Sequence, residues 1–217
     1  MPDIILWGAT GQAKVLHEAL QDTGIAVAAI VDNRELPSPV PGVPVLTGDP
    51  GLEAWLARHK QSPELLFAIA VGGSRGVDRL KLFDLMKARG LRPHTIIHRT
   101  AFVAADARLG EGCQVLAMAA VCAQARLGNL VIVNTAASVD HDCVIGDGAH
   151  IAPGAHLAGE VVVGPRAFVG IGAAVLPRLR IGEDAIVGAG AVVTRNVPAG
   201  ATVVGNPARP VDAARGR

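Results

Sequence analysis

The most constraining feature of this chain is an aliphatic residue at every sixth position from Val103 to Val193, without exception. A second, mostly small apolar residue stands two positions before each of these, from Ala101 to Ala191. A period of six fits neither an α-helix, which repeats every 3.6 residues, nor a lone strand, which repeats every two. The pattern therefore indicates a repeating coil in which each hexapeptide forms one flat side and its turn, with the aliphatic residue pointing inward.

The residue after the aliphatic position is often glycine, which we interpret as a requirement of tight turns between the sides of the coil. These glycines are Gly110, Gly128, Gly146, Gly164, Gly170, Gly182 and Gly188. Half of all residues are hydrophobic, but only 3% are aromatic and there is no tyrosine. Such a composition suits a narrow core of Val, Ile, Leu and Ala. The sequence therefore predicts a parallel β-helix over residues 99–217, with residues after Pro210 forming a frayed tail.

Residues 1–98 follow a different pattern, in which apolar runs alternate with helical segments. Strands are predicted at Ile4–Trp7, Ala26–Val31, Leu65–Val71 and Thr95–Ile97, and helices up to Leu20, over Leu52–His59, and from Gly72–Arg75 to Arg89. Strand and helix in alternation are typical of a small parallel sheet with helices on its faces. We therefore predict two domains, a Rossmann-like domain (1–98) and the β-helix (99–217).

Bulk properties exclude several functional classes. The net charge of +1 and the pI of about 7.8 give no reason to expect a nucleic-acid partner. The amino-terminal apolar run is too short for a signal peptide, and no uninterrupted stretch of twenty apolar residues predicts a membrane span. Cys113, Cys122 and Cys143 form no C-x-x-C pair, which favours reduced thiols in a cytoplasmic protein.

Two glycine loops and one acidic residue are the candidate ligand-binding features of residues 1–98. The first loop places backbone N–H groups and a helix N-terminus after a strand, which suits a phosphate, although it could also be a simple tight turn. Asp32 could bind a ribose or base, or could cap a turn. Ligands of such sheets bind at the carboxyl ends of the strands. The candidates are Gly8, Thr10, Gly11, Gln12 and Lys14 in the first loop, Asp32 and Asn33, and Gly73 and Arg75 in the second loop.

Within the coil, His141 stands beside Asp142 on a turn and points outward by its phase in the repeat. An imidazole with an acidic neighbour meets the basic requirement of a general base. A solvated surface histidine is the plain alternative. His141, His150 and His156 could also form a zinc site of the kind found in gamma-class carbonic anhydrases, and this alternative stays open.

The Rossmann-like layout, the hexapeptide coil, the segment from Asn134 to His150 and the tail Val-Val-Gly-Asn-Pro-Ala-Arg209 together resemble the sialic acid O-acetyltransferase/bacillosamine-pathway family of sugar acyltransferases. The resemblance covers nearly the whole chain. It implies a left-handed coil and a homotrimer with acetyl-CoA in the groove between neighbouring β-helices. It also implies His141 as base, Asp142 as its partner, Asn134 as a substrate contact, and His150, Gly170, Gly188 and Arg209 near the acetyl donor.

One departure from the family lies in the first loop, where Gly-Gly-His followed by Gly or Ala and Lys is usual but this chain reads Thr10-Gly-Gln-Ala-Lys14. The resemblance implies N-acetylation of a nucleotide-linked 4-amino-4,6-dideoxy sugar, GDP-perosamine or a UDP-linked sugar, by direct attack on acetyl-CoA without a metal. O-acetylation of a sugar hydroxyl is an alternative within the same enzyme class. A metal-binding or non-catalytic β-helix is the alternative outside it.

Overall fold

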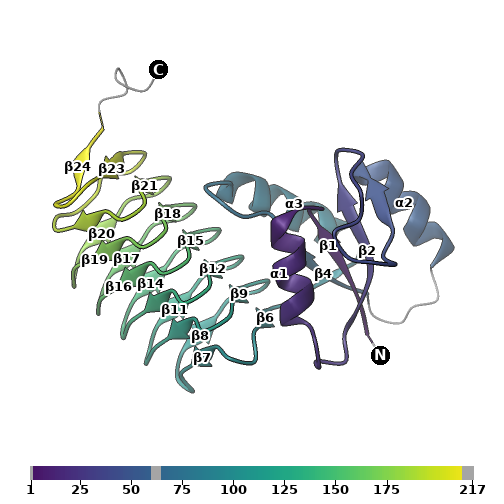
Figure 1. Cartoon of the computed structure of the whole chain (residues 1–217), viewed down its shortest axis with the longest axis horizontal. Helices are drawn as coiled ribbons and strands as arrows, with labels where there is room; N and C mark the ends of the chain where they lie inside the picture. The colour runs from purple at the N-terminus through teal and green to yellow at the C-terminus, as the bar shows by residue number, and fades with distance from the viewer. Residues whose placement is uncertain (1, 60–64, 212–217) are drawn as a thin grey trace.

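The computed structural model describes residues 2–59 and 65–211, which form an amino-terminal α/β unit followed by a β-helix (Figure 1). The α/β unit has five parallel strands in the order β3-β2-β1-β4-β5. The strands are β1 (Asp3–Trp7), β2 (Ala26–Asp32), β3 (Val45–Thr47), β4 (Leu65–Ile69) and β5 (Arg92–Pro93), and the helices are α1 (Gly11–Ala19), α2 (Gly48–Arg58) and α3 (Gly76–Ala88). The Rossmann-like fold is thus confirmed, with β3 and β5 as short edge strands that the sequence pattern did not show.

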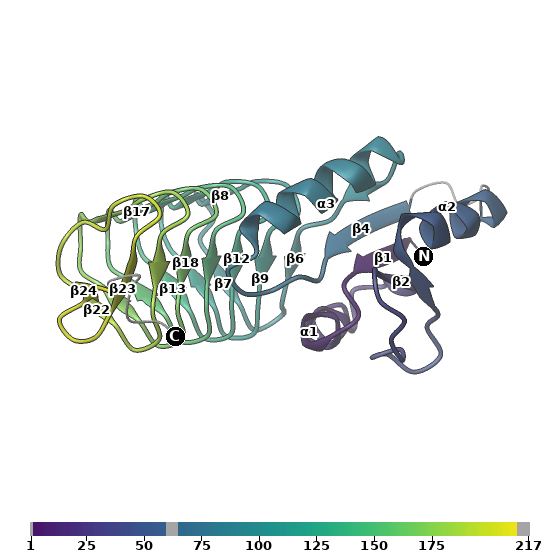
Figure 2. The ribbon, with the colours of Figure 1, turned by 90° about the horizontal axis from the view of Figure 1, so that it is seen from above.

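Helix α1 covers one face of this sheet, and α2 and α3 cover the other (Figure 2). Alternate residues of β1 point to opposite faces, so Ile4 packs with Leu16 of α1, whereas Ile5 packs with Trp55 of α2 and Phe83 of α3. No helix among the described residues has the length and apolar character needed to cross a bilayer.

The β-helix is left-handed, and its strands from β6 to β22 pair in parallel with neighbours 18 residues away, which makes three sheets. The first sheet contains β7 (Phe102–Val103), β10 (Ala120–Val121), β13 (Ser138–Val139), β16 (His156–Leu157), β19 (Ala174–Val175) and β22 (Val192–Val193). The second contains β8 (Arg108–Leu109), β11 (Arg126–Leu127), β14 (Val144–Ile145), β17 (Val162–Val163) and β20 (Arg180–Ile181). The third contains β6 (Ile96–Ile97), β9 (Gln114–Val115), β12 (Ile132–Val133), β15 (His150–Ile151), β18 (Phe168–Val169), β21 (Ile186–Val187), β23 (Thr202–Val204) and β24 (Arg209–Pro210).

The interior of the coil confirms the phase of the six-residue repeat. Val139, Ile145 and Ile151 are buried in one continuous core, and the small residues Ala137 and Cys143 fill the space between them. The first coil is less enclosed, since its inward residues Val103 and Leu109 are partly buried.

The first strand of the coil lies earlier in the chain than expected. Ile96 and Ile97 were expected to end the amino-terminal sheet, and that prediction was wrong, because they pair with Gln114 and Val115 of β9. An apolar run shows that a strand is buried but not which strand it pairs with. The coil therefore begins before residue 98, and the exact domain boundary stays a prediction, as does the tail, most of which (212–217) lies outside the described residues.

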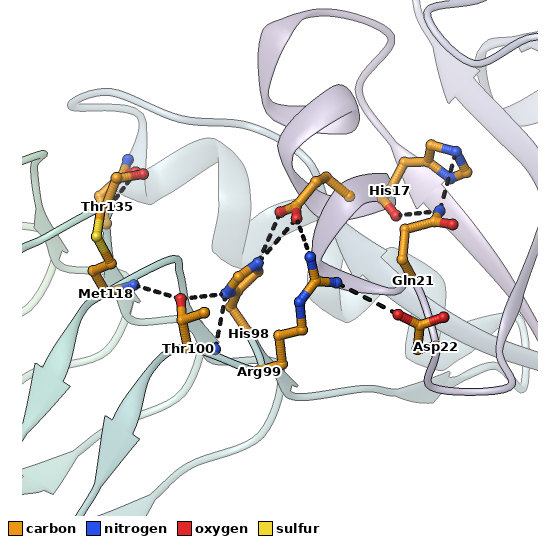
Figure 3. A network of polar contacts seen from close by, with 10 residues as sticks. His17, Gln21, Asp22, His98, Arg99, Thr100, Met118 and Thr135 are labelled. Atoms are coloured by element: carbon orange, nitrogen blue, oxygen red, sulfur yellow. Dashed lines mark hydrogen bonds and ion pairs between the residues drawn. The ribbon is translucent and has the colours of Figure 1, made fainter.

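The two parts of the chain are joined by apolar and polar contacts. Leu116 and Ile132 point outward from the coil and pack into the apolar cluster beneath α1. His98, at the start of the coil, bonds through Nε2 to Glu18 of α1 at 3.0 Å and through Nδ1 to Thr100 at 2.8 Å (Figure 3). The α/β unit is thus docked on the outer face of the third sheet.

The glycines after the aliphatic positions have a different purpose from the one expected. None of them has a positive φ; left-handed residues stand two positions later, as at Arg166 (φ 59°) and Gly190 (φ 67°). A Cβ on Gly164 would instead lie 2.5 Å from the backbone nitrogen of Glu183 in the next coil. The turn explanation was therefore wrong: these glycines allow successive coils to approach closely.

This explanation predicts unequal effects of alanine at two glycines of the coil. Gly164→Ala forces the stacked backbones apart and should lower the free energy of unfolding by about 3 kcal/mol. Gly190→Ala meets nothing within 4 Å and introduces only left-handed strain, which should cost about 1 kcal/mol. Urea unfolding of both variants measures the difference, and equal costs at the two sites would contradict the close-approach explanation.

Candidate active site

A cavity of about 310 Å³ opens at the carboxyl ends of β1, β2 and β4. From β1 the chain adds β2 and β3 on one side of the sheet and then β4 and β5 on the other. Parallel sheets bind ligands at this switch point between β1 and β4. The cavity contains four of the predicted residues, Gly8, Asp32, Asn33 and Arg75. The lining residues that the sequence analysis missed are Trp7, Arg34, Val71, Asp78 and Leu82.

The first glycine loop leads from β1 into α1. Gly8 has φ +121°, and a Cβ there would lie 2.3 Å from the carbonyl oxygen of Ala70, so only glycine fits. Thr10 and Gly11 are exposed at the start of α1, and Lys14 is exposed one turn later. No described side chain caps this helix, and its first turn contains no acidic residue. The positive end of the helix dipole is therefore available to an anion.

Asp32 stabilises this loop through hydrogen bonds. Its carboxylate accepts hydrogen bonds from the backbone N–H of Ala9 at 3.0 Å and from the backbone and side chain of Arg34 at 3.1 Å. Burial opposes ionisation, but the hydrogen bonds from Arg34 and Ala9 outweigh it and lower the pKa of Asp32. The turn-bracing alternative is thus observed directly, and contact of Asp32 or the exposed Asn33 with a ribose stays a prediction.

Gln12 and Gly73 face the coil as well as the first domain. Gln12 donates to Oε1 of Gln114 at 2.7 Å, and Gln114, which is fully buried on β9, donates to the carbonyl oxygen of Ile69 at 2.7 Å. The carbonyl oxygen of Gly73 accepts from His150 and Arg79, each at 3.1 Å. Gln114 and Arg79 were not predicted, because Gln114 meets Ile69 across 45 residues and Arg79 meets Gly148 across 69.

The structure brings His150 and Asn134 together at this joint. His150 is buried, its Nδ1 donates to Gly73, and its Nε2 accepts from the side-chain amide of Asn134 at 3.0 Å. Burial, together with the nearby charge of Arg79, lowers the pKa of His150 to about 4. The imidazole is therefore neutral with both nitrogens engaged, and its contact with an acetyl donor stays a prediction.

His141 has the opposite environment. It follows β13 on the outer surface, its side chain is 53% exposed, and its Nδ1 lies 2.8 Å from Oδ2 of Asp142. The hydrogen bond with Asp142, helped by the charges of Asp140 and Glu160, raises the pKa of His141. With the proton held on Nδ1, Nε2 presents a lone pair, as a general base requires.

Gly159 is a neighbour of His141 that the sequence analysis missed. A Cβ at this position would lie 2.3 Å from Nε2 of His141, so the missing side chain leaves space for the ring. Gly159 comes 18 residues after His141, one full coil, and this spacing is the signal that could have revealed it.

Three residues predicted to bind acetyl-CoA lie away from the turn that bears His141. Gly170 and Gly188 follow strands of the third sheet, whereas His141 follows a strand of the first, and Arg209 is exposed on β24. Their contacts with acetyl-CoA stay predictions. Within the described chain, no three His, Cys, Asp or Glu side chains are grouped so as to hold a metal ion.

Comparison with known proteins identifies the family. Residues 160–195 match the bacterial transferase hexapeptide (six repeats) model, and no curated protein sequence matches the chain. Perosamine N-acetyltransferase (PerB) from Caulobacter crescentus, solved with CoA and GDP-perosamine, is 40% identical over 97% of both chains, with a TM-score of 0.88. The chain belongs to this family of hexapeptide-repeat sugar N-acetyltransferases.

Two further members of the family support the assignment. The acetyltransferase domain of PglB from Neisseria gonorrhoeae is 34% identical over 96% of this chain and 99% of that one, with a TM-score of 0.84. WeeI from Acinetobacter baumannii is 30% identical over 97% of this chain and 100% of that one, with a TM-score of 0.86. The C. crescentus enzyme was also solved with the histidine numbered 141 in that protein replaced by asparagine or by alanine.

The buried state of His150 predicts a dependence of stability on pH. Its folded pKa of about 4 lies below the ordinary 6.5, so the unfolded chain takes up the proton first as the pH falls. Between pH 7 and pH 5 this should lower the free energy of unfolding by about 2 kcal/mol.

Urea unfolding of the natural protein and of His150→Gln at both pH values isolates this effect from that of the carboxylates. The natural protein should lose about 2 kcal/mol more than the variant. The same loss in both proteins would mean that His150 is not the group responsible.

Proposed function

We propose that this enzyme transfers the acetyl group of acetyl-CoA to the amine of a nucleotide-linked 4-amino-4,6-dideoxy sugar, GDP-perosamine or its UDP-linked counterpart. The main support is that a chain 40% identical to perosamine N-acetyltransferase has both a cavity of about 310 Å³ at the strand ends and the His141–Asp142 pair on its coil. That enzyme was solved with CoA and GDP-perosamine bound.

The nucleotide would occupy the cavity beside β1 and β4. The uncapped start of α1 and the guanidinium of Arg75 would face the diphosphate, and Lys14 adds a positive charge on the same helix. The proposed contacts are Gly8, Thr10, Gly11, Gln12, Lys14 and Arg75 for the diphosphate, Asp32 and Asn33 for the ribose or base, and Gly73 and Asn134 toward the sugar.

His141 would act as the base in a direct transfer. The sugar amine attacks the thioester carbon, the new C–N bond forms, and the C–S bond breaks. Nε2 of His141 takes the proton that the nitrogen loses, and that proton then passes to the thiolate of CoA. Asp142 stabilises the imidazolium formed in between. Holding the two substrates together contributes much of the acceleration, because the thioester is already reactive.

We further propose a homotrimer, with the acetyl-CoA groove between adjacent coils. His141 is half-exposed and does not line the nucleotide cavity, so a second chain can complete its surroundings. Phe102, Met118 and Ile171 are exposed apolar side chains on the coil, as expected at a subunit contact. The free cysteines Cys113, Cys122 and Cys143 agree with a cytoplasmic enzyme.

The first test measures thiol release from acetyl-CoA with GDP- and UDP-linked 4-amino sugars. The natural protein should acetylate one of them, and His141→Asn should lower kcat by about 10²- to 10⁴-fold with little change in either KM. The control is His156→Asn, which removes an exposed imidazole whose Nδ1 lies 2.8 Å from Oγ of Ser138.

If His141→Asn turns over nearly as fast as the natural protein, His141 is not the base. Transfer to sugar hydroxyls but to none of the amines would replace N-acetylation by O-acetylation.

The second test follows kcat/KM with pH. His141 must be neutral to act as a base, so activity should rise with pH through its pKa, which Asp142 holds above the ordinary value. Asp142→Asn should move this acid limb to lower pH and also reduce the plateau. Glu160→Gln, which removes a more weakly acting charge, should shift the limb less in the same direction. An unmoved limb in Asp142→Asn would show that another group sets it.

A further inference from the structure

The edge of β4 that faces the coil has an unusual set of hydrogen-bond partners. β5 pairs with this edge only as far as Phe67, whose carbonyl oxygen accepts from the backbone N–H of His94 at 2.9 Å. No strand of the described residues pairs with this edge at the next alternate carbonyls, those of Ile69, Val71 and Gly73. Each accepts from a side chain instead.

Three side chains continue the ladder where β5 ends. Gln114 donates to Ile69 at 2.7 Å, Arg79 donates to Val71 at 3.2 Å and to Gly73 at 3.1 Å, and His150 donates to Gly73 at 3.1 Å. The carbonyl of Ile69, which is buried, requires such a partner, because leaving it unpaired costs its desolvation energy.

All three donors are fixed to the coil. Gln114 and His150 stand at the same outward register of the third sheet, two coils apart, with Ile132 between them. Arg79 belongs to α3, but its Nη2 also bonds the carbonyl oxygen of Gly148 in the coil, and it is only 1% exposed. These hydrogen bonds therefore hold the end of β4 in a fixed position relative to the coil.

The segment held in this way is the second loop of the nucleotide cavity. Val71 and Arg75 line that cavity, and Gln12 of the first loop is tied to the same ladder through Oε1 of Gln114. We propose that Gln114, with Arg79, is a positioning residue that holds both loops of the nucleotide site in register with the coil that bears His141. The expected change in the KM for the nucleotide sugar rests on the proposed function, whereas the expected change in loop mobility does not.

Docking of the two parts does not depend on Gln114 alone, since Leu116 and Ile132 bury apolar surface at the same joint. Loss of the Gln114 amide should therefore loosen the loops without separating the parts. Gln114→Met removes both hydrogen bonds at nearly constant size. Gln114→Leu likewise removes both hydrogen bonds, and it serves if the methionine variant folds poorly. Ile132→Met is the matched control at the same register, 18 residues later.

The experiment has two readouts. Hydrogen exchange of the segment 71–75 should become faster in the Gln114 variants and not in Ile132→Met. The KM for the nucleotide sugar should rise about 3- to 10-fold, the size expected for one or two lost hydrogen bonds, while the KM for acetyl-CoA stays within about twofold. In a cycle of Gln12→Met with Gln114→Met, the two increases in hydrogen exchange at 71–75 should be less than additive, because both changes remove the same Gln12–Gln114 hydrogen bond.

The outcomes separate the two proposals. Unchanged exchange at 71–75, or faster exchange with an unchanged KM for the nucleotide sugar, overturns the positioning role of Gln114. Equal increases in both KM values also overturn it, because they indicate a general loss of structure. A natural protein that acetylates no nucleotide-linked sugar refutes the proposed function, and the exchange rates alone then decide whether Gln114 holds the loops.

Discussion

The backbone hydrogen bonds between successive coils are the interaction on which the rest of the structure depends. Each coil advances by 18 residues, so the N–H of Val144 donates to Val161 and that of His150 donates to Ala167. This spacing fixes the direction of every side chain, inward or outward, for the whole length of the repeat. The surroundings of His141 follow from it, since Gly159 lies beside the imidazole because it is one coil further along.

The same outward register explains how the amino-terminal unit is attached. The third sheet presents Gln114, Ile132 and His150 in one row, and the α/β unit covers that row. Its apolar member contributes burial, and its polar members pair with backbone carbonyls that have lost a neighbouring strand. An apolar row would leave the carbonyl of the buried Ile69 without its side-chain donor, so Gln114 is a requirement of the joint.

The sequence was sufficient to predict those parts of the structure that depend on a local pattern. The inward aliphatic series and the main strands of the first domain were predictable, because each rests on periodicity within a short segment. Partners distant in sequence were not predictable: Gln114 meets Ile69 across 45 residues, and His150 meets Gly73 across 77. The short strand at Ile96–Ile97 was assigned to the wrong sheet for the same reason. Candidate site residues were found where glycine or charge marked them, as at Gly8 and His141.

Two histidines of the coil, His141 and His150, show why residue type alone could not rank the candidates. The ring of His150 is buried with both nitrogens engaged, so burial and Arg79 push its pKa down. The ring of His141 is exposed and bonded through one nitrogen to Asp142, so its pKa moves up and its other nitrogen remains accessible. A general base needs both an accessible lone pair and a group to stabilise the cation it forms. Of these two, the environment of His141 offers both, whereas His150 is suited to hold a loop in place.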